Sequence, residues 1–268
     1  MTRGRDEPSL DDAKAKLARA KLHSECFNKA HEEVTNGHVY LFGVDIYDGG
    51  RTHLYWADHP PATDPRFALI AGDCVHNLRS ALDHLAWELV RVSGKKQPNR
   101  TTQFPARQHQ PFSRSWCGLR RSAERADIRP GIGDKVREIV DSVQPYKGTP
   151  TGKRLAILCD LDAIDKHHHL LVDAAIAPMA GSGGYQVGVD PEPRMQLLDT
   201  RLTKHRKPVL KVTYDRPRPE RNPDLTITPW IMFEGGPTGP KKRTVSGVLA
   251  DLCILVEDEI FPMFERFF

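Results

Sequence analysis

The sequence predicts an α+β protein: a helical bundle with an N-terminal β-hairpin insertion and a small antiparallel sheet before the C-terminal helix. Long segments carry apolar residues at helical spacing, two short β-prone runs flank an Asp-Gly-Gly turn at residues 48–50, and a later region alternates β-branched and polar residues between proline-rich turns. We expect residues 1–268 to form a single domain. Its helical core would comprise residues 8–35, 66–93, 131–177 and 244–267, and its β-rich insertions residues 38–57 and 185–234.

The first helix is predicted over residues 10–34, which are rich in alanine, lysine, leucine and glutamate. It starts behind a candidate N-cap, Ser9, and the Asn36-Gly37 pair ends it. Apolar residues recur along it at helical spacing, namely Leu10, Ala13, Leu17, Ala20 and Ala30. Residues 39–46 and 52–56 then form the predicted hairpin.

Residues 66–92 have the clearest amphipathic pattern in the chain. On a helical wheel at roughly 100° per residue, one face is apolar and consists of Cys74, Val75, Leu78, Ala81, Leu82, Leu85, Ala86 and Leu89. The other side is polar and carries Asp73, His76, Asn77, Ser80, Asp83, His84 and Trp87. Short functional side chains stand there instead of lysine and glutamate, which suits a site of fixed geometry. The alternative is that this stripe packs against another helix through buried hydrogen bonds.

The second half of the chain continues with a short helix over residues 134–143 and a helix or broken pair of helices over residues 154–175. Strands follow at residues 197–202, 209–214 and 225–233. An amphipathic helix over residues 245–267 closes the chain, and Pro262 should kink or end it. Its apolar side includes Val248, Leu252, Leu255 and Val256.

A second polar cluster lies in residues 160–169, which include Asp162, Asp165, His168 and His169. Asp165 and His169 are four residues apart and could share a helix face with Asp162. We predict that the functional centre lies between this cluster and the polar stripe of residues 73–87. The alternative is a helix terminus, where cationic imidazoles meet the carbonyl ends of the helix.

The run Arg79-Ser80-Ala81-Leu82-Asp83-His84 resembles the Arg-polar-x-x-x-His signature of the HEPN superfamily. These are all-helical domains, many of them metal-independent endoribonucleases in toxin and antiviral systems. The resemblance covers this one helix. It implies that His84 is the acid/base group, that Arg79 stabilises the charged phosphorane, and that Ser80 occupies the polar position. Asn77 and Asp73 lie on the same stripe, and the family's dimer cleft implies a homodimer.

Two other interpretations use the same residues. The HEPN interpretation needs no cofactor, whereas a metal-dependent hydrolase would use a divalent metal held by carboxylate and imidazole groups from two helices, namely Asp73, His76, His84, Asp165 and His169. The third interpretation is a non-catalytic binding or scaffolding module whose polar helix face is structural. Its β-region, with Trp230 and Phe233, would contact the partner.

The distribution of charge suggests RNA as a partner. Residues 100–137 hold nine Arg or Lys against three Asp or Glu, and residues 201–243 hold eleven against four. The five cysteines include no C-x-x-C pair, so no disulfide framework or zinc knuckle is expected. No apolar run is long enough for a membrane span, and the first residues lack a secretory signal. We therefore expect a cytoplasmic protein without a membrane partner.

Overall fold

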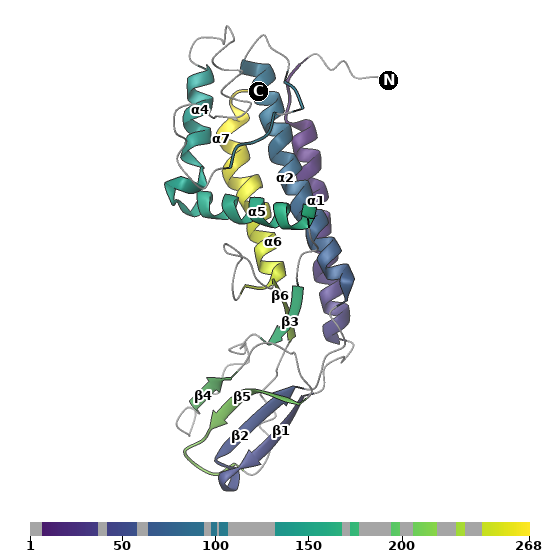
Figure 1. The fold of residues 1–268 in the computed structure, drawn as a ribbon, viewed down its shortest axis with the longest axis vertical. Coiled ribbons are helices and arrows are strands. Elements are labelled where there is room, and N and C mark those ends of the chain that lie inside the picture. The colour runs from purple at the N-terminus through teal and green to yellow at the C-terminus, as the bar shows by residue number, and fades with distance from the viewer. Residues whose placement is uncertain are drawn as a thin grey trace. The chain divides into compact units, whose positions relative to one another are not determined.

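The computed structural model describes residues 7–36, 42–57, 64–93, 98–100, 102–106, 132–167, 172–176, 194–198, 206–218, 229–233 and 243–268. The chain forms two compact units (Figure 1). The helical unit comprises residues 1–27, 68–170 and 235–268, and the β unit comprises residues 28–67 and 171–234. The predicted α+β class is confirmed, since helices, an inserted hairpin and an antiparallel sheet before the C-terminal helix are all present.

The two longest helices begin where the sequence supplies capping groups. Helix α1 (Asp11–Asn36) follows Ser9, whose hydroxyl accepts a hydrogen bond from the Asp11 N–H. Helix α2 (Pro65–Ser93) has a proline at its first position, and the carboxylate of the preceding Asp64 accepts from the Arg66 N–H. Both starts leave fewer unsatisfied N–H groups at the helix end.

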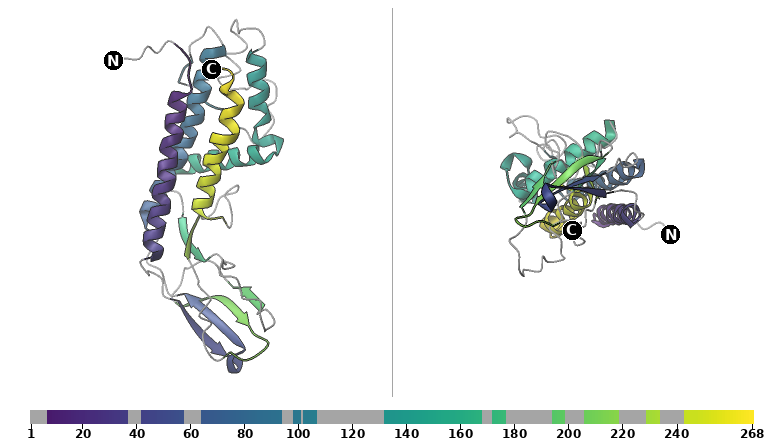
Figure 2. Two further views of the ribbon diagram at one scale, coloured as in Figure 1. Left: turned by 180° about the vertical axis from the view of Figure 1, so that it is seen from behind. Right: turned by 90° about the horizontal axis from the view of Figure 1, so that it is seen from below.

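In the helical unit, α1 and α2 run beside the C-terminal helix, and α5 (Pro150–His167) crosses them (Figures 1 and 2). Helix α4 (Ile132–Ser142) precedes α5, and a short 3-10 turn (Pro145–Lys147) separates the two. All eight residues of the predicted apolar face of α2 are completely buried. The predicted apolar residues of α1 and of the C-terminal helix are buried as well. Burial of these side chains, at about 1.5–3 kcal/mol for each large one, holds the bundle together.

The C-terminal helix does not end at Pro262. It runs from α6 (Val245–Ile254) through a π-helical segment (Leu255–Ile260) into α7 (Phe261–Glu265). Proline lacks an N–H, and its ring clashes with the carbonyl four residues earlier. The wider π turn directly before Pro262 shifts the hydrogen bonding to the fifth residue back. The helical path therefore continues to Glu265.

The prediction of helix was wrong for residues 172–176. Helix α5 ends at His167, and Val172–Ile176 is a strand, β3. Alanines favour a helix locally, but β3 pairs antiparallel with β6 (Pro229–Phe233), and the branched Val172 and Ile176 suit a strand. Pairing between distant segments has overridden local propensity here.

The four-stranded sheet of the β unit combines the hairpin with the later strands in the order β1-β2-β5-β4, all antiparallel. Its strands are β1 (Phe42–Tyr47), β2 (Thr52–Ala57), β5 (Lys207–Thr213) and β4 (Arg194–Leu197). The predicted turn joins β1 to β2, and Asp48, Gly49 and Gly50 all have positive φ there (55°, 62° and 95°). Aspartate and glycine are the residues that tolerate this conformation.

Candidate functional site

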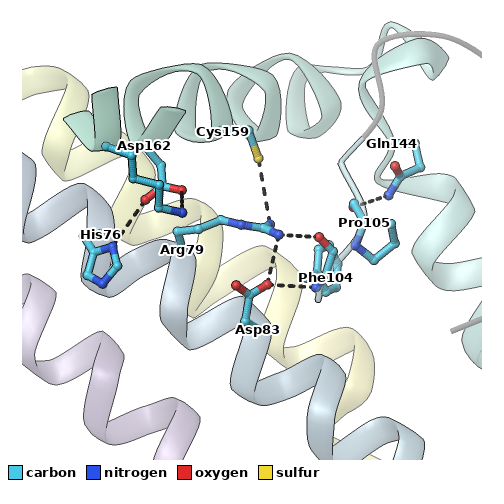
Figure 3. Close-up of polar contacts among 9 residues, drawn as sticks. His76, Arg79, Asp83, Phe104, Pro105, Gln144, Cys159 and Asp162 are labelled. Carbon is cyan, nitrogen blue, oxygen red and sulfur yellow. Dashed lines mark hydrogen bonds and ion pairs between the residues drawn. The ribbon is translucent and has the colours of Figure 1, made fainter. Parts of the chain in front are cut away.

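Arg79, the arginine of the predicted signature, binds the backbone of Phe104 (Figure 3). We call Arg79, Asp83 and Gln144 together the Phe104 clamp. Arg79 lies on α2 with only 11% of its side chain exposed. Its Nη2 donates to the Phe104 carbonyl at 2.7 Å and lies 2.9 Å from Asp83 Oδ1. The same Oδ1 accepts from the Phe104 N–H at 2.9 Å. One turn of helix thus satisfies both backbone groups of Phe104.

Gln144 extends the clamp by one residue. Its Nε2 donates to the carbonyls of Pro105 and Val140, both at 2.9 Å, and the residue is 1% exposed. The Phe104 ring is buried and meets Phe264 of α7 edge-on, with ring centroids 6.3 Å apart. Buried backbone groups away from helices and strands need such partners. The clamp therefore fixes residues 104–105 between α2, α4 and α7.

Burial raises the pKa of Asp83 in the clamp and of Cys159 beside it. Desolvation raises the pKa of Asp83 above its usual value, although Arg79 and the Phe104 N–H both act to lower it. The Arg79–Asp83 pair thus does not recover the full cost of removing the carboxylate from water. Arg79 Nη1 also lies 3.9 Å from Cys159 Sγ of α5. Desolvation raises the pKa of that thiol to about 11.

The crossing of α2 and α5 brings together members of the two predicted polar clusters (Figure 3). Asp162 is 5% exposed, and its Oδ2 accepts from Lys166 Nζ at 2.6 Å. Its Oδ1 lies 3.4 Å from Nδ1 of His76, whose side chain is 54% exposed. One helical turn before His76 on α2, Gly72 lies so close to Asp165 that an added Cβ would stand 2.2 Å from the carboxylate. We call these contacts the α2–α5 crossing.

The remaining predicted site residues of α2 make no hydrogen bond or ion pair with Arg79 in the described part of the chain. His84 is half-buried and makes no hydrogen bond or ion pair within the described part of the chain. Asn77 Nδ2 donates to the Asp73 carbonyl of its own helix, and the Asp73 carboxylate is 3.9 Å from His23 Nδ1. Ser80 is half-buried, and Trp87 is 37% exposed. His168 and His169 lie outside the described residues.

The described residues include no group of three or more His, Cys, Asp or Glu side chains placed to hold a metal ion. Because His169 belongs to the alternative metal set and lies outside those residues, that set stays a prediction. The predicted contact role of Phe233 is wrong, because this residue is only 8% exposed. Alternation along β6 places Ile231 and Phe233 on the same, buried side of the strand. The side chain of Trp230 lies outside the described residues.

The sequence did not predict that three residues of this region take part in these contacts: Phe104, Gln144 and Cys159. The first contributes its backbone groups, which every residue possesses, so no residue type marks it. A glutamine before a proline is also an ordinary loop residue. An arginine and an aspartate four apart on a helix do signal a pair, and this spacing in Arg79 and Asp83 was the available clue.

Among the described residues, no helix is long and apolar enough to cross a membrane. Comparison with known proteins finds no matching family model, no matching curated protein and no matching solved structure.

Proposed function

We propose that this chain is a non-catalytic binding module in which the polar face of α2 is a structural lock. The observation that supports this proposal most strongly is that Arg79 is already bound by groups of the protein itself. Its guanidinium is largely buried, donates to the Phe104 carbonyl and pairs with Asp83. A group that stabilises a phosphorane needs donors aimed at the position of the developing charge. The donors of Arg79 are aimed at the protein's own backbone.

The α2–α5 crossing supports the same proposal. Asp162 is buried between Lys166 and His76, and Asp165 occupies the space left by the missing side chain of Gly72. Short polar side chains lose little conformational entropy when they are fixed. This property serves a helix interface as well as it serves an active site, which explains why the stripe on α2 has the composition of both.

The experiment that tests this proposal is incubation of the purified protein with labelled total RNA, with and without EDTA, beside the His84→Ala variant. We expect no cleavage by either protein under either condition. Circular dichroism of both proteins controls for folding. Cleavage that EDTA abolishes would contradict the proposal and favour a metal-dependent hydrolase using Asp73, His76, His84 or Asp165.

The second candidate function is a HEPN-like, metal-independent endoribonuclease, of a toxin or defence system and acting as a homodimer. One observation favours it: the imidazole of His84 is half-buried and has no hydrogen-bonding or ionic partner among the described residues. Such an imidazole is available for proton transfer. In this function Arg79 would position α2 through the Phe104 clamp. Cleavage that survives EDTA and disappears in His84→Ala would establish this candidate in place of the binding module.

A further inference from the structure

We infer that the outer face of the four-stranded sheet binds single-stranded RNA. We define the outer face by Tyr47 of β1, Trp56 of β2, Lys211 of β5, Arg194 of β4 and Arg206, which precedes β5. The inference rests on the proposed binding function and names its partner. It also places part of the basic segment of residues 201–243 on one surface.

The strand register shows that these residues share a side of the sheet. Tyr47 is opposite Thr52, which is opposite Thr213, which is opposite Arg194. Residues directly opposite in antiparallel strands point to the same face, and neighbours along a strand point to the other. The inner face carries His53, Tyr55, Leu210 and Val212, all buried. By alternation, Tyr47 and Arg194 lie on the other face, where they are exposed by 49% and 81%.

A three-layer stack forms one end of the outer face, opposite the end that carries Tyr47 and Arg194. The Trp56 ring lies against Gly43, where an added Cβ would come within 2.0 Å of the ring. The Arg206 guanidinium lies over the same ring at 4.7 Å from its centroid. Asp45 holds both groups, accepting from Trp56 Nε1 at 3.3 Å and from Arg206 Nη2 at 2.8 Å. Glycine at position 43 thus makes room for the indole.

Arg206 reaches this stack from an unfavourable backbone conformation. Its φ is 49°, in the left-handed region that residues with a Cβ rarely adopt. Its side chain is nevertheless 57% exposed, so the guanidinium remains open to solvent above the indole. Guanidinium planes and tyrosine rings are the surfaces on which unpaired RNA bases stack. The outer face offers one of each, Arg206 and Tyr47.

The charge of the outer face suits a polyanion. Among the described residues, it carries three basic side chains, Arg194, Arg206 and Lys211, against the Asp45 carboxylate that pairs with Arg206. A base can therefore stack on Tyr47 while Lys211 and Arg194 lie near the phosphates. Double-stranded RNA keeps its bases stacked inside the helix and cannot use the tyrosine in this way. This difference selects single strands over duplexes.

The test is fluorescence anisotropy with a labelled 12-nucleotide oligouridine and with a duplex RNA of the same length. We expect the single strand to bind more tightly than the duplex. We expect Tyr47→Ala to weaken single-strand binding about tenfold. The double variant Arg194→Gln with Lys211→Gln should reduce the slope of log K against log salt by about 0.7 for each lost phosphate contact. Matched controls are Leu22→Ala and Lys153→Gln, exposed positions of the helical unit, which should leave binding unchanged.

Two results would overturn the inference. One is equal binding by Tyr47→Ala and the unaltered protein, which would place any RNA contact elsewhere. The other is no binding of the single strand at all, which would point to a protein as occupant of the outer face. Neither result bears on the absence of cleavage, which tests the proposed function separately. Conversely, RNA cleavage would overturn the binding module, and the oligouridine titration could still be made with the His84→Ala variant.

Discussion

Arginines in the two units of the molecule have opposite surroundings. In the helical unit, Arg79 is 11% exposed and is bound to Phe104 and Asp83. In the β unit, Arg206 is 57% exposed above Trp56, and Arg194 is 81% exposed. Arg79, which lies in the HEPN-like pattern, is therefore bound within the fold, whereas Arg194 on β4 and Arg206 beside β5 remain accessible to solvent. Residue type and spacing identify a polar group, but its availability depends on the backbone groups near it.

Among the substitutions that test this comparison, Arg79→Ala should have the largest effect on stability. Removal of the guanidinium leaves the Asp83 carboxylate and the Phe104 carbonyl without their cationic partner in a largely buried place. We expect a loss of about 3 kcal/mol in the free energy of unfolding, measured by urea denaturation at pH 7. Arg79→Lys should restore only part of it, because an ammonium group cannot reproduce the planar set of donors.

The control for this variant is Lys153→Ala, at an exposed position of α5, which should change stability by less than about 0.5 kcal/mol. The pH dependence supplies a second check. Burial raises the pKa of Asp83, and a raised carboxyl pKa contributes stability at low pH that is lost as pH rises through it. The cost of Arg79→Ala should therefore shrink as pH falls and Asp83 becomes protonated. An equal cost at pH 7 and at pH 4, close to the ordinary aspartate pKa of 3.8, would contradict this explanation.

Gly72→Ala probes the α2–α5 crossing. The new Cβ would lie 2.2 Å from Asp165 Oδ1, so α5 or the carboxylate must move. We expect a destabilisation of about 1–3 kcal/mol from overpacking, although alanine is the better helix former. Thermal unfolding measures the change, and Gly72→Val should cost more than Gly72→Ala. A stabilised Gly72→Ala protein would show that the helices do not cross closely at this residue.

A smaller effect is expected where α5 meets the C-terminal helix. Burial acts to raise the pKa of Glu259, but hydrogen bonds from Arg154 and Thr151 outweigh it, and the pKa lies below its usual value. A lowered carboxyl pKa contributes stability above the unfolded-state pKa of about 4.3 that is lost as pH falls through the folded-state pKa. Glu259→Gln should therefore flatten the fall in melting temperature between about pH 5 and pH 3. The effect should stay below about 1 kcal/mol because the pair is partly exposed.

The relative exposure of the cysteines can be tested without any substitution, by labelling their thiols. Cys26 is exposed, Cys74 and Cys253 are buried, and burial raises the pKa of Cys159 to about 11. Since the thiolate is the reactive form, a short pulse of N-ethylmaleimide at pH 8 should label Cys26 before Cys74, Cys159 and Cys253, the other three cysteines that the structure describes. Mass spectrometry of the peptides would show the order. Labelling of Cys159 as fast as Cys26 would mean that α5 separates readily from Arg79.

Periodicity predicted the helical core well, because burial of an apolar face depends on spacing that one sequence displays. Every residue of the predicted apolar face of α2, from Cys74 to Leu89, is buried. Pairing between distant segments leaves no such signal. The sequence pattern therefore did not reveal that β2 pairs with β5, or that residues 172–176 form a strand with β6. The Phe104 clamp was missed for a related reason, because its acceptor is a backbone carbonyl.

In the proposed function, Arg79 and Asp83 act together as a structural lock. A double-mutant cycle of Arg79→Ala, Asp83→Ala and the double variant, followed by urea unfolding, measures this coupling directly. Because both side chains bind Phe104 and each other, we predict a coupling free energy of about 0.5–3 kcal/mol. If the stability losses of the two single variants add up to that of the double variant within about 0.3–0.5 kcal/mol, the lock is contradicted. A catalytic role for Arg79 would then be favoured instead.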